Sequence, residues 1–257
     1  MSKRKASEIV SSKADTVDKS VRARLPVQRL DMTTTANNKK ASKEGGVGCI
    51  KVTVYEEKQP LPSRQSNGDL IFSDHPEFVP NLTPKDILQL GSFGGTYFRP
   101  IYSGVTKQNY KDCWKEFPED WFTGLDINKQ VASSSYSTKV NTYGVSCGGD
   151  LHMWESSGWI SEADPYGWFQ WYCRFYLGRR SSDDTRQISR GNGVINSTGR
   201  WRNNLINKCL APGRPLKDVV DDKKISPKVR QLLQHWGYKL TLLDLEKAAK
   251  KMVGKSK

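Results

Sequence analysis

The sequence predicts an α+β fold: a single compact, aromatic-rich domain with short β-strands and several helices, a C-terminal helical hairpin and a disordered basic N-terminal arm. Three observations support this prediction. A few β-branched runs precede a longer series of capped helical patterns. Seven of the eight tryptophans lie between residues 114 and 201, where we expect the main core. The two ends are polar and basic. We therefore place the arm at residues 1–46, the folded core at 47–210, and a basic linker with the hairpin at 211–257.

The ends of the chain carry the whole excess of positive charge. The net charge is +14, to which residues 1–43 contribute +7 and residues 211–257 another +7. A neutral body with basic ends favours attachment to a polyanion through the ends. The first 46 residues contain few large apolar side chains, which predicts disorder. Lys3-Arg4-Lys5 fits a small nuclear-import signal, although runs this short also occur by chance.

Cysteine spacing and hydropathy exclude several classes of protein. The five cysteines are far apart and odd in number, which predicts buried thiols in a reducing compartment rather than a disulfide framework or a zinc site. The sequence has no apolar run approaching roughly 18 residues and no amino-terminal signal pattern. We therefore expect a nuclear or cytoplasmic protein with no membrane partner, no cofactor and no metal.

The first half of the core predicts two short strands and one short helix. Residues 49–55 alternate and are β-branched, and residues 69–72 form a second strand-like run. The run that starts at Thr83 has an N-cap, a proline at the first helical position and an aspartate placed to answer the cap, so it predicts a helix that ends at Gly91. The glycines of residues 91–95 predict a tight turn rather than a phosphate-binding loop, because no helix begins behind them.

The most informative segment runs from Asp164 to Arg180. Asp164 as a cap, Pro165 as a start and Gly178 as a stop predict a helix there. Its aromatic residues surround the helix axis, so we expect a central, nearly encircled core helix. The later capping signals predict further helices, which we place at residues 182–190, 199–210, 226–236 and 241–253.

Seven arginines lie among tryptophans and tyrosines between residues 168 and 202. Guanidinium groups bind phosphates by forked hydrogen bonds, and flat rings stack on bases. The candidate nucleic-acid-binding residues are therefore Arg174, Arg179, Arg180, Arg186, Arg190, Arg200 and Arg202, with Trp168 and Trp171 for stacking. The competing interpretation is internal pairing, because residues 44–165 carry six more acids than bases and residues 166–210 carry six more bases than acids. The sequence leaves both open.

The helix pair at residues 226–253 has a second possible role. A helix, a short glycine-containing turn and a lysine-rich helix match the layout of a helix-turn-helix, whose second helix enters a DNA groove. The leucines of this segment are explained more simply by an amphipathic hairpin docked on the body.

Two patterns keep an enzymatic interpretation open. Cys147, Asp150 and His152 lie within six residues around two glycines, which permits a thiol hydrolase, although a turn leading into a strand at residues 152–155 is the simpler expectation. A second pattern is a set of four carboxylates that could gather a divalent metal for phosphodiester cleavage: Glu155, Asp164, Asp183 and Asp184. A capping position explains Asp164 more simply, and first-turn positions explain Asp183 and Asp184.

The sequence as a whole predicts a protein that binds DNA or RNA with an Arg/aromatic surface and basic arms. The second interpretation is an enzyme acting on nucleic acid, of nuclease or glycosylase type, with a carboxylate in its pocket. The third is a protein-interaction module whose basic tails serve solubility or targeting. Binding to a polyanion predicts a steep loss of affinity with salt, because each neutralised phosphate releases counterions.

Overall fold

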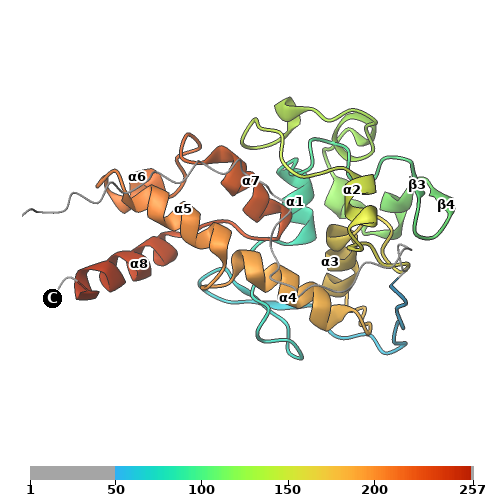
Figure 1. Cartoon of the computed structure of the whole chain (residues 1–257), viewed down its shortest axis with the longest axis horizontal. Helices are drawn as coiled ribbons and strands as arrows, with labels where there is room; N and C mark the ends of the chain where they lie inside the picture. Colours follow the sequence, from blue (N-terminus) through green and yellow to red (C-terminus); the bar gives the residue numbers. More distant parts are fainter. Residues whose placement is uncertain (1–49, 256–257) are drawn as a thin grey trace, which may run out of the picture. The chain divides into compact units, whose positions relative to one another are not determined.

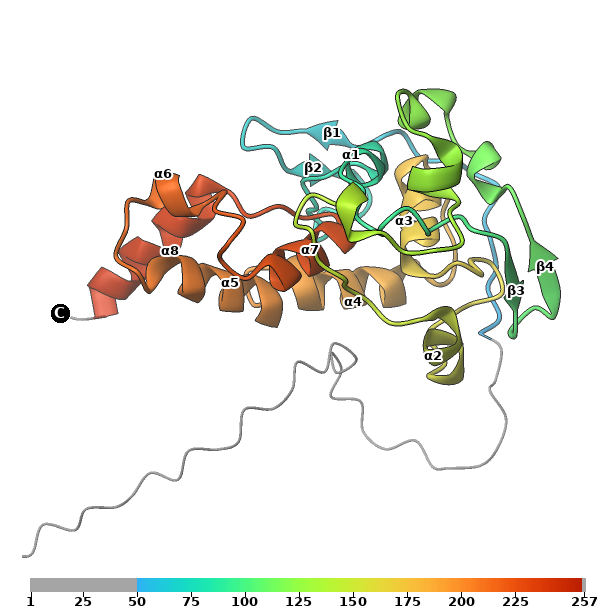
Figure 2. The ribbon, with the colours of Figure 1, turned by 90° about the horizontal axis from the view of Figure 1, so that it is seen from above.

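Helices predominate in the part of the chain that the computed structural model describes, residues 50–255 (Figure 1). Strands β1 (Ser63–Arg64) and β2 (Leu70–Ile71) form one antiparallel pair, and β3 (Ile101–Ser103) and β4 (Gln108–Tyr110) form a second, separate pair (Figure 2). The α-helices are α1 (Pro84–Gln89), α2 (Leu151–Ser156), α3 (Trp168–Tyr176), α4 (Asp184–Ile195), α5 (Arg200–Leu210), α6 (Leu216–Val219), α7 (Pro227–His235) and α8 (Leu242–Lys255). The predicted α+β class is confirmed, whereas the predicted arm at residues 1–46 lies outside the described residues.

Short helices of tighter or wider winding connect β4 to α2. They are η1 (Cys113–Glu116), η2 (Glu119–Phe122), the π-helical η3 (Ile127–Val131) and η4 (Thr138–Val140). None of the helices within residues 50–255 combines the length and the apolar character of a membrane span.

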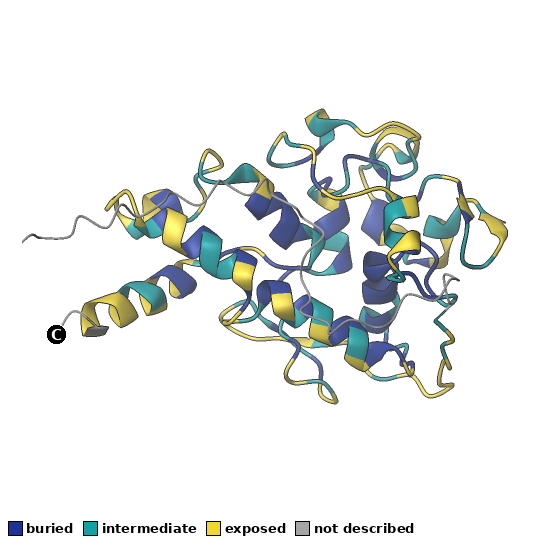
Figure 3. Ribbon diagram, viewed as in Figure 1, coloured by how far each residue is buried: buried dark blue, intermediate teal, exposed yellow. Residues whose placement is uncertain are grey.

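Helix α3 is the centre of the core, as predicted. Seven of its nine residues are buried, and it is almost uniformly dark in Figure 3. The predicted start is wrong by three residues: Gly167, with a φ of 86°, precedes the first helical residue, so Pro165 lies outside the helix. Asp164 is not its cap, because its carboxylate accepts hydrogen bonds from arginine side chains instead.

Helix α1 and the glycine turn behind it follow the sequence expectations. Thr83 and Asp86 form the predicted capping box. The turn at residues 91–95 packs directly on neighbouring backbone: a Cβ atom on Gly91 would lie 1.8 Å from the carbonyl oxygen of Val140. The glycines are therefore needed for close packing, as the turn interpretation requires.

Two predicted strands are wrong. Residues 50–55 do not join a sheet; Ile50 and Val54 each make only an isolated bridge, to residues far apart in the chain, and Cys49 lies outside the described residues. The segment predicted as a strand at residues 152–155 lies in helix α2, because the Asp150 side chain caps the backbone N–H of Met153.

The last helices pack against α5, which contacts α6, α7 and α8 (Figure 1). Thr241 and Asp244 form the capping box predicted for α8. Leu232, Leu233 and Leu245 are buried in the same hydrophobic core as α3, which supports the docked-hairpin interpretation. Helix α4 continues through its predicted end at Gly191, and α6 was not predicted.

Candidate functional site

Two of the candidate arginines share one fully buried carboxylate. Asp164 is 0 % exposed and accepts hydrogen bonds from Arg174 Nη1 at 3.0 Å and from Arg179 Nη1 and Nη2 at 2.9 and 2.7 Å. Arg174 also forms a forked pair with Glu116, with donor–acceptor distances of 2.8 and 2.7 Å. The charges of both guanidinium groups are therefore balanced inside the fold.

Three more candidate arginines are paired in the same way. Arg180 forms a forked pair with Asp74 at 2.7 and 3.0 Å, Arg186 pairs with Asp183 at 2.5 Å, and Arg202 pairs with Asp244. The guanidinium carbon of Arg180 also lies 3.9 Å from the ring centroid of Phe175. Internal pairing thus accounts for five of the seven candidates; a direct contact of these five with nucleic acid stays a prediction.

The two candidate tryptophans are both buried, and only one of them lines a pocket. Trp171 is 0 % exposed, and its indole N–H donates to Asp184 Oδ1 at 2.8 Å. Trp168 is also buried and donates to the backbone oxygen of Gln187 at 3.1 Å, but it lines a pocket, whereas Trp171 does not. Of the two, Trp168 is the one placed to meet a ligand.

This pocket, called the aromatic pocket below, has a volume of about 300 Å³. It collects side chains from the turn before β3, the segment around α2, the start of α3, and helices α4, α5 and α7. No Asp or Glu of the described residues is among its lining side chains. Five tryptophans line it: Trp154, Trp159, Trp168, Trp201 and Trp236.

Arg190 projects into the aromatic pocket without a carboxylate partner among the described residues. Its guanidinium carbon lies 4.4 Å from the ring centroid of Trp159 and 5.6 Å from that of Trp236, and Nη1 donates to Gln187 Oε1 at 2.9 Å. Burial, helped by the nearby Arg186 charge, lowers the pKa of Arg190 to about 9. Arg190 is therefore charged at neutral pH, and its charge is poorly compensated.

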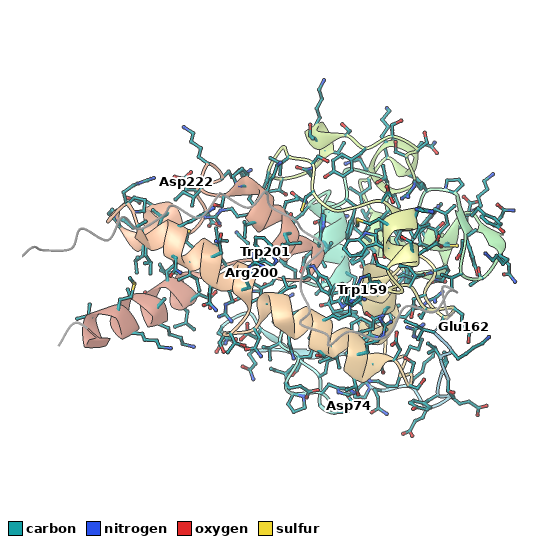
Figure 4. All side chains as sticks on the ribbon, in the orientation of Figure 1. Asp74, Trp159, Glu162, Arg200, Trp201 and Asp222 are labelled. Carbon is teal, nitrogen blue, oxygen red and sulfur yellow. The ribbon has the colours of Figure 1, made fainter. Side chains whose placement is uncertain are left out.

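Two further cations border the same space. Arg99 lines the pocket, and its Nη1 donates to the backbone oxygen of Thr96. Arg200 is exposed, and its guanidinium carbon lies 5.0 Å from the ring centroid of the pocket residue Trp201; Figure 4 shows the two side by side at the start of α5. Neither makes a salt bridge within residues 50–255. The candidate arginines that lack such a partner are thus those at the pocket, Arg190 and Arg200.

His235 gives the pocket a hydrogen-bond acceptor. Its Nε2 lies 2.5 Å from the backbone oxygen of Ser92, and a carbonyl only accepts, so Nε2 carries the proton and Nδ1 carries a lone pair. Burial lowers the pKa of His235 to about 4, so the ring is neutral at pH 7. A Cβ atom on the pocket residue Gly148 would lie 3.9 Å from Nδ1. Nδ1 has no hydrogen-bond donor among the described residues.

The residues considered for catalysis do not form a catalytic arrangement. No hydrogen bond joins the side chains of Cys147, Asp150 and His152 in the described structure. Burial raises the pKa of the Cys147 thiol to about 12, which keeps it protonated. Glu155 is buried and accepts from Ser103 Oγ and the Gly104 N–H. Within residues 50–255, no three His, Cys, Asp or Glu side chains lie together in a way that could hold a metal ion.

Seven exposed lysines between residues 217 and 251 form no salt bridge with a described residue. Asp222 pairs with Arg214 and Asp221 pairs with Lys239 instead. We call the seven lysines the C-terminal lysine group: Lys217, Lys223, Lys224, Lys228, Lys247, Lys250 and Lys251. One member adjoins the pocket, because the thiol of the pocket residue Cys147 contacts the backbone oxygen of Lys228 at 3.7 Å.

The sequence reasoning missed Arg99, His235 and Trp236. On helix α4 the sequence does contain a signal that distinguishes the unpaired arginine from the paired one. The residue three positions before Arg186 is an acid, Asp183, whereas the residue three positions before Arg190 is Gln187. No protein-family model matches the chain, and neither the curated proteins nor the solved structures contain a significant match to it.

Proposed function

We propose that the protein binds nucleic acid through cations that have no carboxylate partner in the described fold. One observation carries the proposal: such cations border an aromatic pocket that no described acid lines. Arg99 and Arg190 lie in the pocket, Arg200 lies beside it, and the C-terminal lysine group begins next to it at Lys228. Arginine and lysine bind phosphates, and the combination of cations with open aromatic faces is typical of single-strand binding.

The internal pairing of the other arginines is compatible with this proposal. A guanidinium that already holds a buried carboxylate would have to give up that bond to take a phosphate, at a cost of several kcal/mol. An exposed lysine exchanges only water and counterions. We therefore assign the phosphate contacts to the unpaired cations, not to Arg174, Arg179 or Arg180.

The enzymatic interpretation receives less support. A nuclease or glycosylase of the kind considered above needs a carboxylate in its pocket. Glu155, Asp164, Asp183 and Asp184 are buried in hydrogen bonds with other parts of the fold, and none lines the aromatic pocket.

The proposal is tested by the salt dependence of binding to a short labelled single strand, followed by fluorescence anisotropy. Between about 50 and 200 mM salt the affinity should fall steeply. The triple variant Lys247→Gln, Lys250→Gln, Lys251→Gln should reduce the slope of log affinity against log salt by about 0.7 for each lost contact.

A matched control changes the same number of charges elsewhere. Lys58, Lys111 and Lys139 are also exposed and lack a salt bridge within the described residues, and they lie outside the C-terminal segment. Their replacement by glutamine should leave the slope unchanged. A flat salt profile, or equal effects of the two triple variants, would contradict the proposal.

A further inference from the structure

We infer that the aromatic pocket receives one unpaired base of the bound strand, stacked among its tryptophans and hydrogen-bonded to His235, with an adjoining phosphate on Arg190. The inference rests on the proposed function and names the part of the strand that enters the pocket. It is argued from the size of the pocket, its ring faces and its polar groups.

The size of the pocket fits one nucleotide unit. Its volume of about 300 Å³ lies at the lower end of the range for ligand sites. A folded duplex or an extended peptide does not fit such a space, whereas a single ring system with its sugar does. The base must therefore be unpaired when it enters.

The ring faces favour a flat ligand. Trp168 and Trp236 contact each other with ring centroids 4.5 Å apart, and Phe93 stacks on one face of His235 at 4.5 Å with an interplanar angle of 22°, so these contacts fix four rings that line the pocket. The other pocket tryptophans add further faces. Stacking of a base on such rings contributes about 1–3 kcal/mol.

The polar groups are the argument against an incompletely filled core. A core gap needs no polar lining, yet this pocket holds the guanidinium of Arg190 and the free lone pair of His235 Nδ1. Both are fixed: Arg190 by Gln187 and two indole faces, His235 by the Ser92 carbonyl. Burying either without a partner costs free energy.

The two groups are complementary to a nucleotide. His235 Nδ1 only accepts, so the ligand must present an N–H, as the edges of nucleobases do. Arg190 only donates, and its charge is destabilised by burial and by Arg186, so it favours an anion such as a phosphate. Within residues 50–255, no carboxylate lines the pocket to repel that anion.

The test compares hexathymidylate with an abasic sugar–phosphate hexamer of the same charge. Protein binding is measured by fluorescence anisotropy of labelled strands, and intrinsic tryptophan fluorescence is recorded in parallel. We expect the strand with bases to bind about 5- to 150-fold more tightly, which is the range set by stacking one base. Arg190→Gln should weaken hexathymidylate binding by about ten- to hundredfold, as expected for lost charge-assisted hydrogen bonds.

A blocking variant isolates the pocket. Ser146 is exposed and lines the pocket, so Ser146→Trp places a ring there without changing charge. It should abolish the difference between the two hexamers. Ser134→Trp, at an exposed serine that does not line the pocket, should preserve that difference. The triple lysine variant of the preceding section removes contacts to phosphates, which both hexamers carry. It should therefore weaken the binding of both hexamers equally.

The outcomes separate this inference from the proposed function. Equal binding of the two hexamers by the unaltered protein would overturn the pocket assignment and leave phosphate binding intact. No salt-dependent binding of either hexamer would overturn the proposed function itself. Saturable binding of thymidine monophosphate without binding of hexathymidylate would also overturn the inference, because the occupant would then be a free nucleotide.

Discussion

Replacing Asp164 by asparagine tests whether Arg174 and Arg179 stabilise the fold through their pairs with this carboxylate. The substitution preserves the size and shape of the side chain and removes its charge. An asparagine also presents an NH₂ group toward guanidinium groups that only donate. The forked bonds from Arg179 and the bond from Arg174 cannot all be kept.

The expected loss follows from what each arginine retains. Arg174 keeps its forked pair with Glu116, so its charge remains compensated. Arg179 has no second carboxylate among the described residues, and its buried Nε has no hydrogen-bond partner there. The variant therefore leaves one uncompensated buried charge. Breaking a buried pair costs about 3–5 kcal/mol, and we expect the lower end of that range.

The free energy of unfolding is measured by urea titration, with tryptophan fluorescence as the signal. The midpoint should fall without a change in the slope of the transition. A loss of about 3 kcal/mol corresponds to a decrease in Tm of roughly 6–12 °C for a chain of this size. Asp120→Asn is the control, because Asp120 pairs with Lys85 at 2.8 Å with both side chains exposed; its loss should stay below about 1 kcal/mol.

A loss of less than about 1 kcal/mol for Asp164→Asn would refute this reasoning. It would mean that Arg174 and Arg179 are well solvated without the carboxylate. They would then be free to meet an external polyanion, and the assignment of phosphate contacts to the unpaired cations alone would fail.

Two further predictions concern His235 and Trp171. Because burial lowers the pKa of His235 from 6.5 to about 4, the unfolded chain binds this proton more readily than the folded one between these values. Its contribution to stability is complete above pH 6.5 and is lost as the pH falls through 4, by about 3 kcal/mol. The free energy of unfolding of His235→Gln, obtained from urea titrations, should therefore depend less on pH by that amount. Trp171→Phe removes the N–H that binds buried Asp184 and should destabilise by about 1–3 kcal/mol. It should leave oligonucleotide affinity unchanged, whereas a large loss of affinity would place Trp171 in the binding site.

The sequence predicted correctly those helix ends that are stabilised by interactions between residues close in the chain. The capping boxes at Thr83 and Thr241 satisfy backbone N–H groups within three residues, so the sequence alone identifies them. A strand depends on a partner in a sheet, and residues 50–55 meet two different segments only through isolated bridges, at Ser161 and Ser181. Helix α4 continues through Gly191 because that glycine packs against Phe78 and Trp168, which are distant in the sequence.

The site was predicted only in part, for the same reason. The surplus of acids before residue 165 correctly indicated that arginines have internal partners. It did not indicate which ones, because Arg180 meets Asp74 across 106 residues of chain. The pocket is assembled from segments between residues 93 and 236, and Arg99 and His235 carry no local pattern that marks them as neighbours.

Gln187 connects the internally paired arginine of helix α4 with the unpaired arginine at the pocket. Buried Asp183 holds both Arg186 and the Gln187 side chain, whose Nε2 donates to Asp183 Oδ2 at 2.9 Å. The oxygen of that same amide accepts from Arg190, and the backbone oxygen of Gln187 accepts from Trp168. The paired part of helix α4 thus fixes the orientation of an unpaired guanidinium and of an indole that lines the pocket. Although residues 44–210 are neutral as a whole, pairing most of their arginines with carboxylates leaves the unpaired arginines Arg99, Arg190 and Arg200 at the aromatic pocket, which no described acid lines.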